Sequence, residues 1–182
     1  MIRVVIFAVV SVPIIWVSRR SLRHPTSHGF WRFFAFETIL ALIVLNAPHW
    51  FAHPFGVPQL ASWLLLSCSL VMAVWGFVLL RRLGGFKPTA EASPTFEWEN
   101  TGRLVTTGIY RYIRHPMYSS LLFLAWGAVL KSMTVTTLIL GAAASLALAA
   151  TAKSEEAENV ARFGQEYRDY MARTRRFVPF LL

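Results

Sequence analysis

The chain has 182 residues, 55% of which are hydrophobic, and its mean hydropathy is +0.49. This composition excludes an ordinary soluble domain, and the length fits one membrane domain, residues 1–182. The net charge of +9 could indicate nucleic-acid binding, but membrane proteins concentrate basic residues beside their spans, so we predict no nucleic-acid partner. Cys68 is the only cysteine, which excludes a disulfide framework and a thiolate zinc cluster.

Apolar segments predict an all-α, integral membrane helical bundle with about five transmembrane helices. In chain order the segments are residues 4–17, 33–47, 57–80, 117–130 and 133–152. A helix needs about 20 residues to cross about 30 Å of hydrocarbon. The third and fifth segments are long enough, whereas the others need flanking residues, tilt or a thinner bilayer. Residues 1–80 thus hold three spans, and residues 81–182 hold a long connection, two spans and the C-terminal region.

The distribution of basic residues predicts the orientation of these spans. Sixteen of the eighteen Lys and Arg residues follow the first, third or fifth span, and only Arg3 and Lys131 lie on the other side. Cytoplasmic loops of membrane proteins carry such an excess. We therefore expect the N-terminus outside and the C-terminus in the cytoplasm.

The two segments that follow the third and fifth spans have patterns of their own. The connection 81–115 is expected to be irregular at first and to pack on the membrane surface near residues 104–110. Residues 154–171 predict an amphipathic cytoplasmic helix, because apolar residues recur at helical spacing, and Ser154 would be its N-cap if the helix starts anew there. Arg162 lies four residues from both Glu158 and Glu166, so ion pairs within this helix would account for it.

The run Arg114-His115-Pro116-Met117-Tyr118 is the first candidate for a binding site. His115 precedes a proline and is therefore biased toward an extended backbone, while Pro116 suits the first turn of the fourth span. The free N–H groups at such a helix start favour a carboxylate or a phosphate. An interfacial anchor accounts for the same residues equally well. The second copy, Arg23-His24-Pro25, lacks both the following tyrosine and the apolar span.

Glu155 and Glu156 are the second candidate. The only polar break between the last two spans is Lys131-Ser132, so a tight hairpin would bring both carboxylates back to His115. Carboxylates at a membrane edge need solvent or a cation, and the alternative is a solvated helix start.

Other polar residues carry less weight. Glu37 lies inside the second span, and we interpret it as structural, because it can reach toward Arg32. The pairs His24/His28 and His49/His53 fall on opposite sides of the membrane and cannot form one four-ligand metal site. No metal ligands are predicted.

Residues 102–179 resemble the superfamily of isoprenylcysteine carboxyl methyltransferases and phospholipid methyltransferases, which are integral membrane enzymes. The resemblance rests on residues 104–112, Arg114 to Tyr118, Glu155-Glu156, Phe163-Gly164 with Tyr167 and Tyr170, and residues 176–179. Two residues depart from the family pattern, since Ser120 replaces a usual glycine and Ile109 a frequent proline. Residues 1–80 contribute spans only.

The resemblance implies that S-adenosylmethionine is the methyl donor and S-adenosylhomocysteine the product. It places the cofactor on the cytoplasmic side, in a pocket lined by Tyr110, Arg114, His115, Pro116, Tyr118, Glu155, Glu156 and Tyr167. It also implies a catalytic role for Arg162 in orienting a substrate. Glu156 or His115 would act as a general base if the acceptor is an amine or a thiol, and for Glu156 this expectation rests on the proximity to His115 that the hairpin imposes. The chain has no Gly-x-Gly-x-x-Gly loop, so a Rossmann-type cofactor site is not expected.

The resemblance further implies a lipid or lipid-like methyl acceptor, with residues 1–80 shaping its side of the site. An isoprenylcysteine-type carboxylate is the acceptor we expect, and a phospholipid amine or a thiol is the alternative within the superfamily. Two readings of other classes are a sterol-type nicotinamide-dependent reductase, which generally has more spans, and a non-enzymatic membrane scaffold.

Overall fold

The computed structural model describes residues 1–85 and 102–178, and this part of the chain is helical without a named strand. Six α-helices follow one another: α1 (Ile2–Ser18), α2 (His28–Asn46), α3 (Val57–Leu83), α4 (Pro116–Val129), α5 (Val135–Phe163) and α6 (Gln165–Arg173). Three short 3-10 helices lie between them: η1 (Ser21–Arg23), η2 (Ala47–His49) and η4 (Gly108–Arg111). The all-α prediction is confirmed for the described residues.

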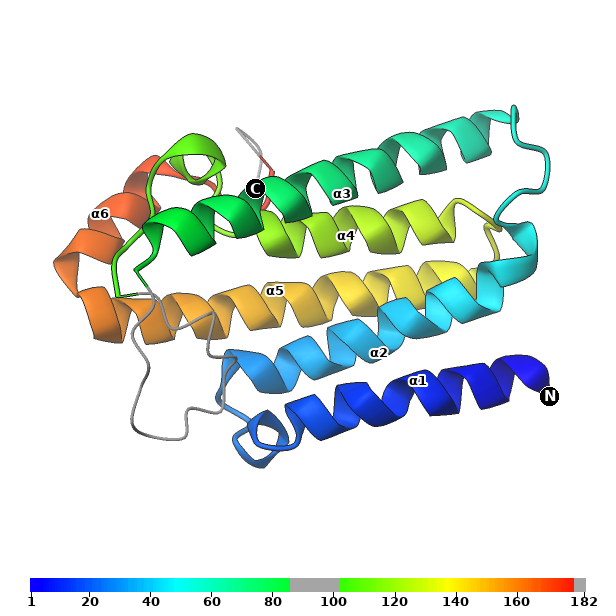
Figure 1. The fold of residues 1–182 in the computed structure, drawn as a ribbon, viewed down its shortest axis with the longest axis horizontal. Coiled ribbons are helices and arrows are strands. Elements are labelled where there is room, and N and C mark those ends of the chain that lie inside the picture. The colour runs from blue at the N-terminus through cyan, green and yellow to red at the C-terminus, as the bar shows by residue number, and fades with distance from the viewer. Residues whose placement is uncertain (86–101, 179–182) are drawn as a thin grey trace.

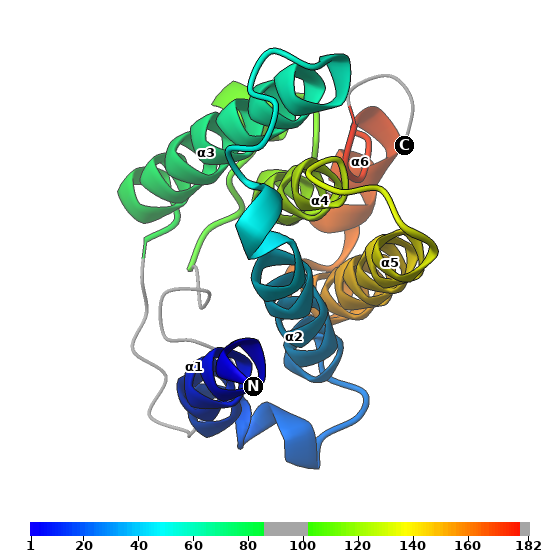
Figure 2. The same ribbon diagram turned by 90° about the vertical axis from the view of Figure 1, so that its right-hand side faces the viewer.

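Helices α1 to α5 lie alongside one another and alternate in direction (Figure 1). Helix α2 packs against α1, α4 and α5, while α4 also packs against α3 and α5 (Figure 2). The alternation places the start of α2, the end of α3, the start of α4 and the end of α5 at one end of the bundle. Helix α6 covers that end, at the left of Figure 1. We call it the site end.

Three helices are long and apolar enough to cross a membrane: α2 extended through η2 (His28–His49), α3 and α5. Helices α1 and α4 are apolar but shorter, and the 14 residues of α4 span only about 21 Å, against about 30 Å of hydrocarbon. Three of the five expected spans are therefore confirmed by length and composition. That α1 and α4 also cross remains a prediction.

Small residues and polar side chains hold α4 against its neighbours. A Cβ added at Gly127 would lie 2.9 Å from Leu66 Cδ2, so only glycine permits this approach between α3 and α4 without rearrangement. Ser62 Oγ donates to the Gly127 carbonyl at 2.6 Å, and Asn46 Nδ2 donates to the Ala128 carbonyl at 2.6 Å. Membrane helices commonly associate through small residues and interhelical hydrogen bonds. These contacts fix the last turn of α4 against α2 and α3.

The predicted C-terminal helix is wrong in its bounds. Helix α5 continues through Ser154 to Phe163, and the chain breaks at Gly164, where φ is +61°. Nothing in residues 152–162 interrupts a helix, whereas glycine readily adopts positive φ. Ser154 is therefore no N-cap. Glu155 and Glu156 lie in the interior of α5, and the alternative that they mark a solvated helix start is also wrong.

The connection between α3 and α4 is described at its two ends only. Its second part agrees with the expected packed segment, since Val105 and Tyr110 are buried and η4 precedes the Arg114-His115 pair. The expected irregular beginning falls mostly on residues 86–101, and Pro179 of the resemblance follows the last described residue. Both lie outside the described part of the chain.

Candidate functional site

The short connection between α4 and α5 brings two distant sequence motifs together at the site end. Arg114 Nε donates to Glu156 Oε1 at 2.9 Å, and His115 Nε2 lies 3.3 Å from the same oxygen. Pro116 occupies the first turn of α4, as its sequence position predicts. The predicted proximity of His115 to the two glutamates is therefore confirmed.

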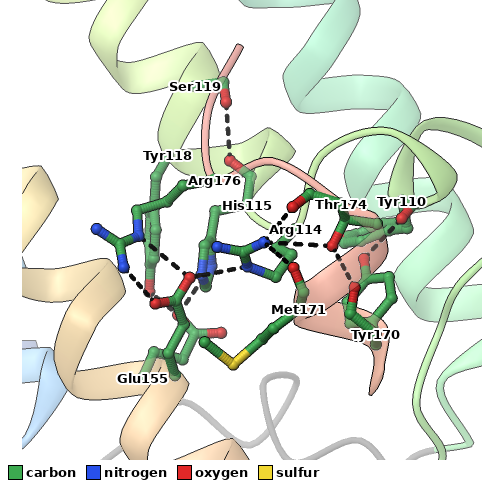
Figure 3. A network of polar contacts seen from close by, with 11 residues as sticks. Tyr110, Arg114, His115, Tyr118, Ser119, Glu155, Tyr170, Met171, Thr174 and Arg176 are labelled. Atoms are coloured by element: carbon green, nitrogen blue, oxygen red, sulfur yellow. Dashed lines mark hydrogen bonds and ion pairs between the residues drawn. The ribbon is translucent and has the colours of Figure 1, made fainter. Parts of the chain in front are cut away.

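Glu156 is the centre of a buried ionic network and is itself only 4% exposed. A second guanidinium reaches it from the C-terminal segment, because Arg176 Nε donates to Oε1 at 3.1 Å and Nη2 to Oε2 at 2.5 Å (Figure 3). One carboxylate thus balances two arginines and contacts one imidazole. Glu156 joins the start of α4, the end of α5 and the segment after α6.

Arg114 ties this network to the end of α6. Its Nη1 donates to the Met171 carbonyl at 3.1 Å and to the Thr174 carbonyl at 2.5 Å. The backbones pair as well, since the Arg114 N–H donates to the Arg175 carbonyl at 2.8 Å and the His115 N–H to the Arg176 carbonyl at 3.2 Å. Side chain and main chain together hold the C-terminal segment beside residues 112–115.

Glu155 faces the other way and has different partners. Its Oε2 accepts a hydrogen bond from the Tyr118 hydroxyl and lies 3.8 Å from His115 Nδ1. The His115 and Tyr118 rings stack with centroids 5.3 Å apart. The Glu155 side chain is 29% exposed, compared with 5% for Glu156, so Glu155 is the carboxylate that a ligand can reach.

A cavity of about 340 Å³ opens beside Glu155. It lies between α2, α3, α4, the end of α5, α6 and the segment that holds η4. Seven of the predicted site residues line it: Tyr110, Arg114, His115, Pro116, Tyr118, Glu155 and Tyr167. Glu156 is not among the lining residues, but it contacts Arg114 and His115, which are.

Comparison with known proteins places the chain in a family. The model of the phospholipid methyltransferase family matches residues 59–166, more than half of the chain. The chain belongs to the phospholipid methyltransferase family. The predicted superfamily is thereby confirmed, and the protein is a membrane methyltransferase. The comparisons with curated proteins and with solved structures returned no match.

Arg162 of this methyltransferase does not line the cavity. It is exposed on α5, with its guanidinium carbon 5.3 Å from the centroid of the Phe163 ring. Glu158, one of the ion-pair partners expected for Arg162, instead binds His28 at the start of α2. His28 Nδ1 lies 2.6 Å from Glu158 Oε2, and the His28 N–H donates to Oε1 at 2.9 Å. That Arg162 contacts the substrate remains a prediction, and its exposed position outside the cavity does not support it.

Sequence reasoning missed several residues of the cavity wall. Asn159 and Phe163 line it together with Glu155. The three residues are spaced four apart on α5 and therefore share one helix face, a signal that the sequence contained. Arg32 and Phe36 line it from α2, and no local pattern could have indicated which helix would lie opposite α5.

Three buried tyrosines surround the cavity. Burial raises the pKa of Tyr110, Tyr167 and Tyr170, and the charge of Glu155 raises that of Tyr110 further. The Tyr170 hydroxyl donates to the Tyr110 carbonyl at 2.6 Å, which links α6 to η4. These phenols therefore supply neutral hydrogen-bonding and aromatic surface rather than charge.

Glu37 also differs from its predicted environment. It accepts a hydrogen bond from Ser11 Oγ at 2.6 Å, so its partner lies on α1 rather than at Arg32. The contact joins α1 to α2, and Glu37 does not line the cavity. Its structural interpretation agrees with this geometry, although the proposed partner was different.

Proposed function

We propose that the protein transfers a methyl group from S-adenosylmethionine to a lipid-like acceptor dissolved in the membrane. The observation that carries this proposal is the cavity itself: it is bounded by polar groups at the site end and reaches between helices long enough to span a bilayer. Because the chain belongs to a family of membrane methyltransferases, we expect this cavity to hold the methyl donor and to receive the acceptor.

The residues around the cavity fit the donor by volume and by chemistry. About 340 Å³ falls within the range of small-molecule pockets, roughly 300–1,000 Å³. The start of α4 offers the positive end of a helix to the methionine carboxylate, and Glu155 offers a carboxylate to its ammonium group. Tyr118, Tyr167 and Asn159 add aromatic and amide surface for the sulfonium, the adenine or the ribose.

Bound S-adenosylmethionine would supply an electrophilic methyl group on a positively charged sulfur. The protein mainly has to align the acceptor's lone pair with that methyl group and to exclude water. Glu155 and Tyr118 would orient the donor from one side, while His115 lies within reach of both glutamates. We assign Glu156 a positioning role, because it holds Arg114, His115 and Arg176 but does not face the cavity.

The acceptor would enter from the bilayer between α2 and α3. Phe36 on α2 and Ala73 on α3 both line the cavity, and both helices are long enough to span a membrane. Arg32 on α2 is 6% exposed and lines the same space. We propose that Arg32 orients the anionic group of the acceptor, the role that the resemblance gave to Arg162.

Two acceptors meet these requirements, and each has a supporting observation. The isoprenylcysteine-type carboxylate is already ionised, needs no base, and would pair with Arg32 directly. A phospholipid amine must lose a proton before it attacks, and its phosphate would pair with Arg32 while Glu155 takes the proton. The match to the phospholipid methyltransferase family supports the second.

Isothermal titration of the detergent-solubilised protein with S-adenosylhomocysteine tests the cofactor. We expect saturable binding that is lost in Tyr118→Ala, and no binding of NADPH. Binding of NADPH but not of S-adenosylhomocysteine would indicate a reductase, and binding of neither would indicate a scaffold. Exposed Glu166→Gln on α6 serves as the matched control and should bind like the parent protein.

Glu155→Gln distinguishes the acceptors in methylation assays at saturating donor. If an amine is the acceptor, loss of the base should lower kcat by about 10²-fold or more. If a carboxylate is the acceptor, kcat should change little and only the KM for the donor should rise. Assays with phosphatidylethanolamine and with a farnesylcysteine derivative, in vesicles that contain each variant, give this comparison directly.

A further inference from the structure

A second hollow lies on the site end, separate from the cavity that holds Glu155. It has a volume of about 250 Å³ and is lined by Arg111, Tyr112, Ala172, Arg173 and Arg175. Three of its five lining residues are arginines, and none is acidic. We call it the arginine hollow. Neither the family resemblance nor the proposed methyl transfer assigns it a role.

The arginines of this hollow lack the compensation that their neighbours have. Within the described residues, none of Arg111, Arg173 and Arg175 forms an ion pair, and Arg173 Nε donates to a neutral group, the Asp169 carbonyl, at 3.1 Å. Arg114 and Arg176, one to three residues away in sequence, instead share Glu156. Three guanidiniums around one hollow repel one another, and an anion between them would relieve that repulsion.

The paired N–H donors of a guanidinium match the oxygens of a carboxylate or a phosphate, and a phosphate has enough oxygens to accept from several guanidiniums at once. The position of the hollow indicates that this phosphate belongs to a lipid head group. It lies at the site end of a bundle whose helices are long enough to span a membrane, and basic clusters beside a span attract anionic lipid head groups. Tyr112 is 50% exposed at its edge, as an aromatic residue at a lipid head-group boundary would be.

We propose that the arginine hollow binds the phosphate of an anionic phospholipid from the bilayer leaflet on the site end. The lipid is here a ligand that regulates the protein rather than the methyl acceptor. Its head group would bridge residues from two segments of the chain, Arg111 on the η4 side and Arg173 with Arg175 after α6.

The backbone makes such a bridge relevant to the proposed active site. The Arg175 N–H donates to the Tyr112 carbonyl at 3.0 Å, and the Arg114 N–H donates to the Arg175 carbonyl at 2.8 Å. The two segments that the lipid would bridge are therefore the same two that carry Arg114 and Arg176 to Glu156. A bound phosphate would stabilise their pairing and, with it, the wall of the Glu155 cavity. This second step rests on the proposed function, whereas lipid binding does not.

Binding is tested first, by native mass spectrometry of the full-length protein with phosphatidylglycerol or phosphatidylcholine. We expect phosphatidylglycerol to bind and the double variant R111Q/R175Q to bind it at least tenfold more weakly. The control R81Q/R82Q removes the same charge from exposed positions on the same end and should bind like the parent protein. Equal losses in the two variants would indicate diffuse attraction to basic charge and would overturn the proposal.

Inorganic phosphate separates the two sources of the ligand. Titration with phosphate alone should give binding at least a hundredfold weaker than that of phosphatidylglycerol. Binding of comparable strength would show that the hollow takes free phosphate, which would overturn the lipid proposal. Thermal unfolding of each variant, followed by circular dichroism, checks that a loss of binding does not come from misfolding.

Activity tests the coupling between the hollow and the active site. Methylation in phosphatidylcholine vesicles should rise severalfold when phosphatidylglycerol is added, and this rise should vanish in R111Q/R175Q but not in R81Q/R82Q. Unchanged methylation alongside intact lipid binding would contradict the coupling. If no methylation occurs under any condition, the proposed function fails, while the binding experiment still decides whether the hollow is a lipid site.

Discussion

At the scale of single residues, charge balance decides what Glu156 can do. A carboxylate that is only 4% exposed stays ionised only if cations compensate its charge. Arg114 and Arg176 compensate the charge of Glu156. Removing the charge of Glu156 should therefore destabilise this network more than removing one of its hydrogen bonds. This asymmetry gives a direct test of the positioning role.

Glu156→Gln should destabilise the protein by about 3–5 kcal/mol, because two guanidiniums would be left without their shared counter-charge. We also expect S-adenosylhomocysteine affinity to fall at least tenfold, about 1.4 kcal/mol, since Arg114 and His115 form part of the cavity wall. Thermal unfolding in detergent and calorimetric titration measure the two effects. Glu166→Gln, exposed on α6, is the control, and full methylation activity in a folded Glu156→Gln protein would contradict any role for this residue.

The buried tyrosines make a prediction about pH. Tyrosines of an unfolded chain ionise near pH 10, and burial raises the pKa of Tyr110, Tyr167 and Tyr170 above that value in the folded protein. Their contribution to stability is therefore complete below about pH 10 and is lost as pH rises further. A near-ultraviolet titration should show tyrosinate formation below about pH 11 unchanged by Tyr110→Phe, Tyr167→Phe or Tyr170→Phe. A reduced signal in any of the three variants would show that its phenol titrates normally.

At the scale of elements, Gly164 sets the angle between α5 and α6. Its φ of +61° and ψ of −130° fall in a region that side chains with a Cβ adopt only at a cost of about 1–3 kcal/mol. No atom lies within 4 Å of a Cβ added there, so the cost is conformational rather than steric. Gly164→Ala should therefore relax by moving α6, which would displace Tyr167 and Tyr170 from the cavity.

We expect Gly164→Ala to weaken S-adenosylhomocysteine binding about tenfold while leaving helix content, measured by circular dichroism, unchanged. Gln165→Ala is the control at the next position, since it removes only an exposed hydrogen bond to Asp169. Equal binding by Gly164→Ala and the parent protein would show that α6 does not contribute to the cofactor pocket.

The sequence predicted which segments form helices more accurately than it predicted where the helices end and which of them make contact. Apolar runs located α1 to α5, and Pro116 located the first turn of α4 correctly. The end of α5 was misplaced because a polar residue, Ser154, can be either a cap or an ordinary helical residue, and only the continuing backbone decides. The pairing of His28 with Glu158 links residues 130 apart, and no local pattern indicates which helices will meet.

At the scale of the whole molecule, the ionic network around Glu156, the Glu155 cavity and the arginine hollow all lie at the site end of the bundle. Large apolar side chains are exposed along α1 and α3, as lipid-facing helices require, including Val4, Trp16, Leu64 and Leu70. The basic residues concentrate at the site end, and the positive-inside rule therefore predicts a cytoplasmic active site. The fold alone leaves this orientation a prediction, because an inverted bundle would have the same internal contacts.

Single cysteines in a Cys68→Ser background can establish the orientation. In sealed, right-side-out vesicles, a membrane-impermeant maleimide should label Phe55→Cys, between α2 and α3, and should label Glu166→Cys on α6 only after detergent is added. Inverted vesicles should give the opposite result. If Glu166→Cys but not Phe55→Cys were labelled in intact right-side-out vesicles, the active site would lie outside. The inner leaflet could then not be the source of the anionic lipid.

Helix α1 needs a test of its own, because its 17 residues extend only about 26 Å. If it crosses the membrane, Arg3→Cys in its first turn and Thr26→Cys beyond its end, both at exposed positions, should be labelled from opposite sides. If α1 instead lies along one surface, both cysteines would be labelled from the same side, and the Ser11–Glu37 hydrogen bond would then join a surface helix to a span. We expect opposite sides, since α1 packs lengthwise against α2 and exposes apolar side chains along its length, which lipid would solvate.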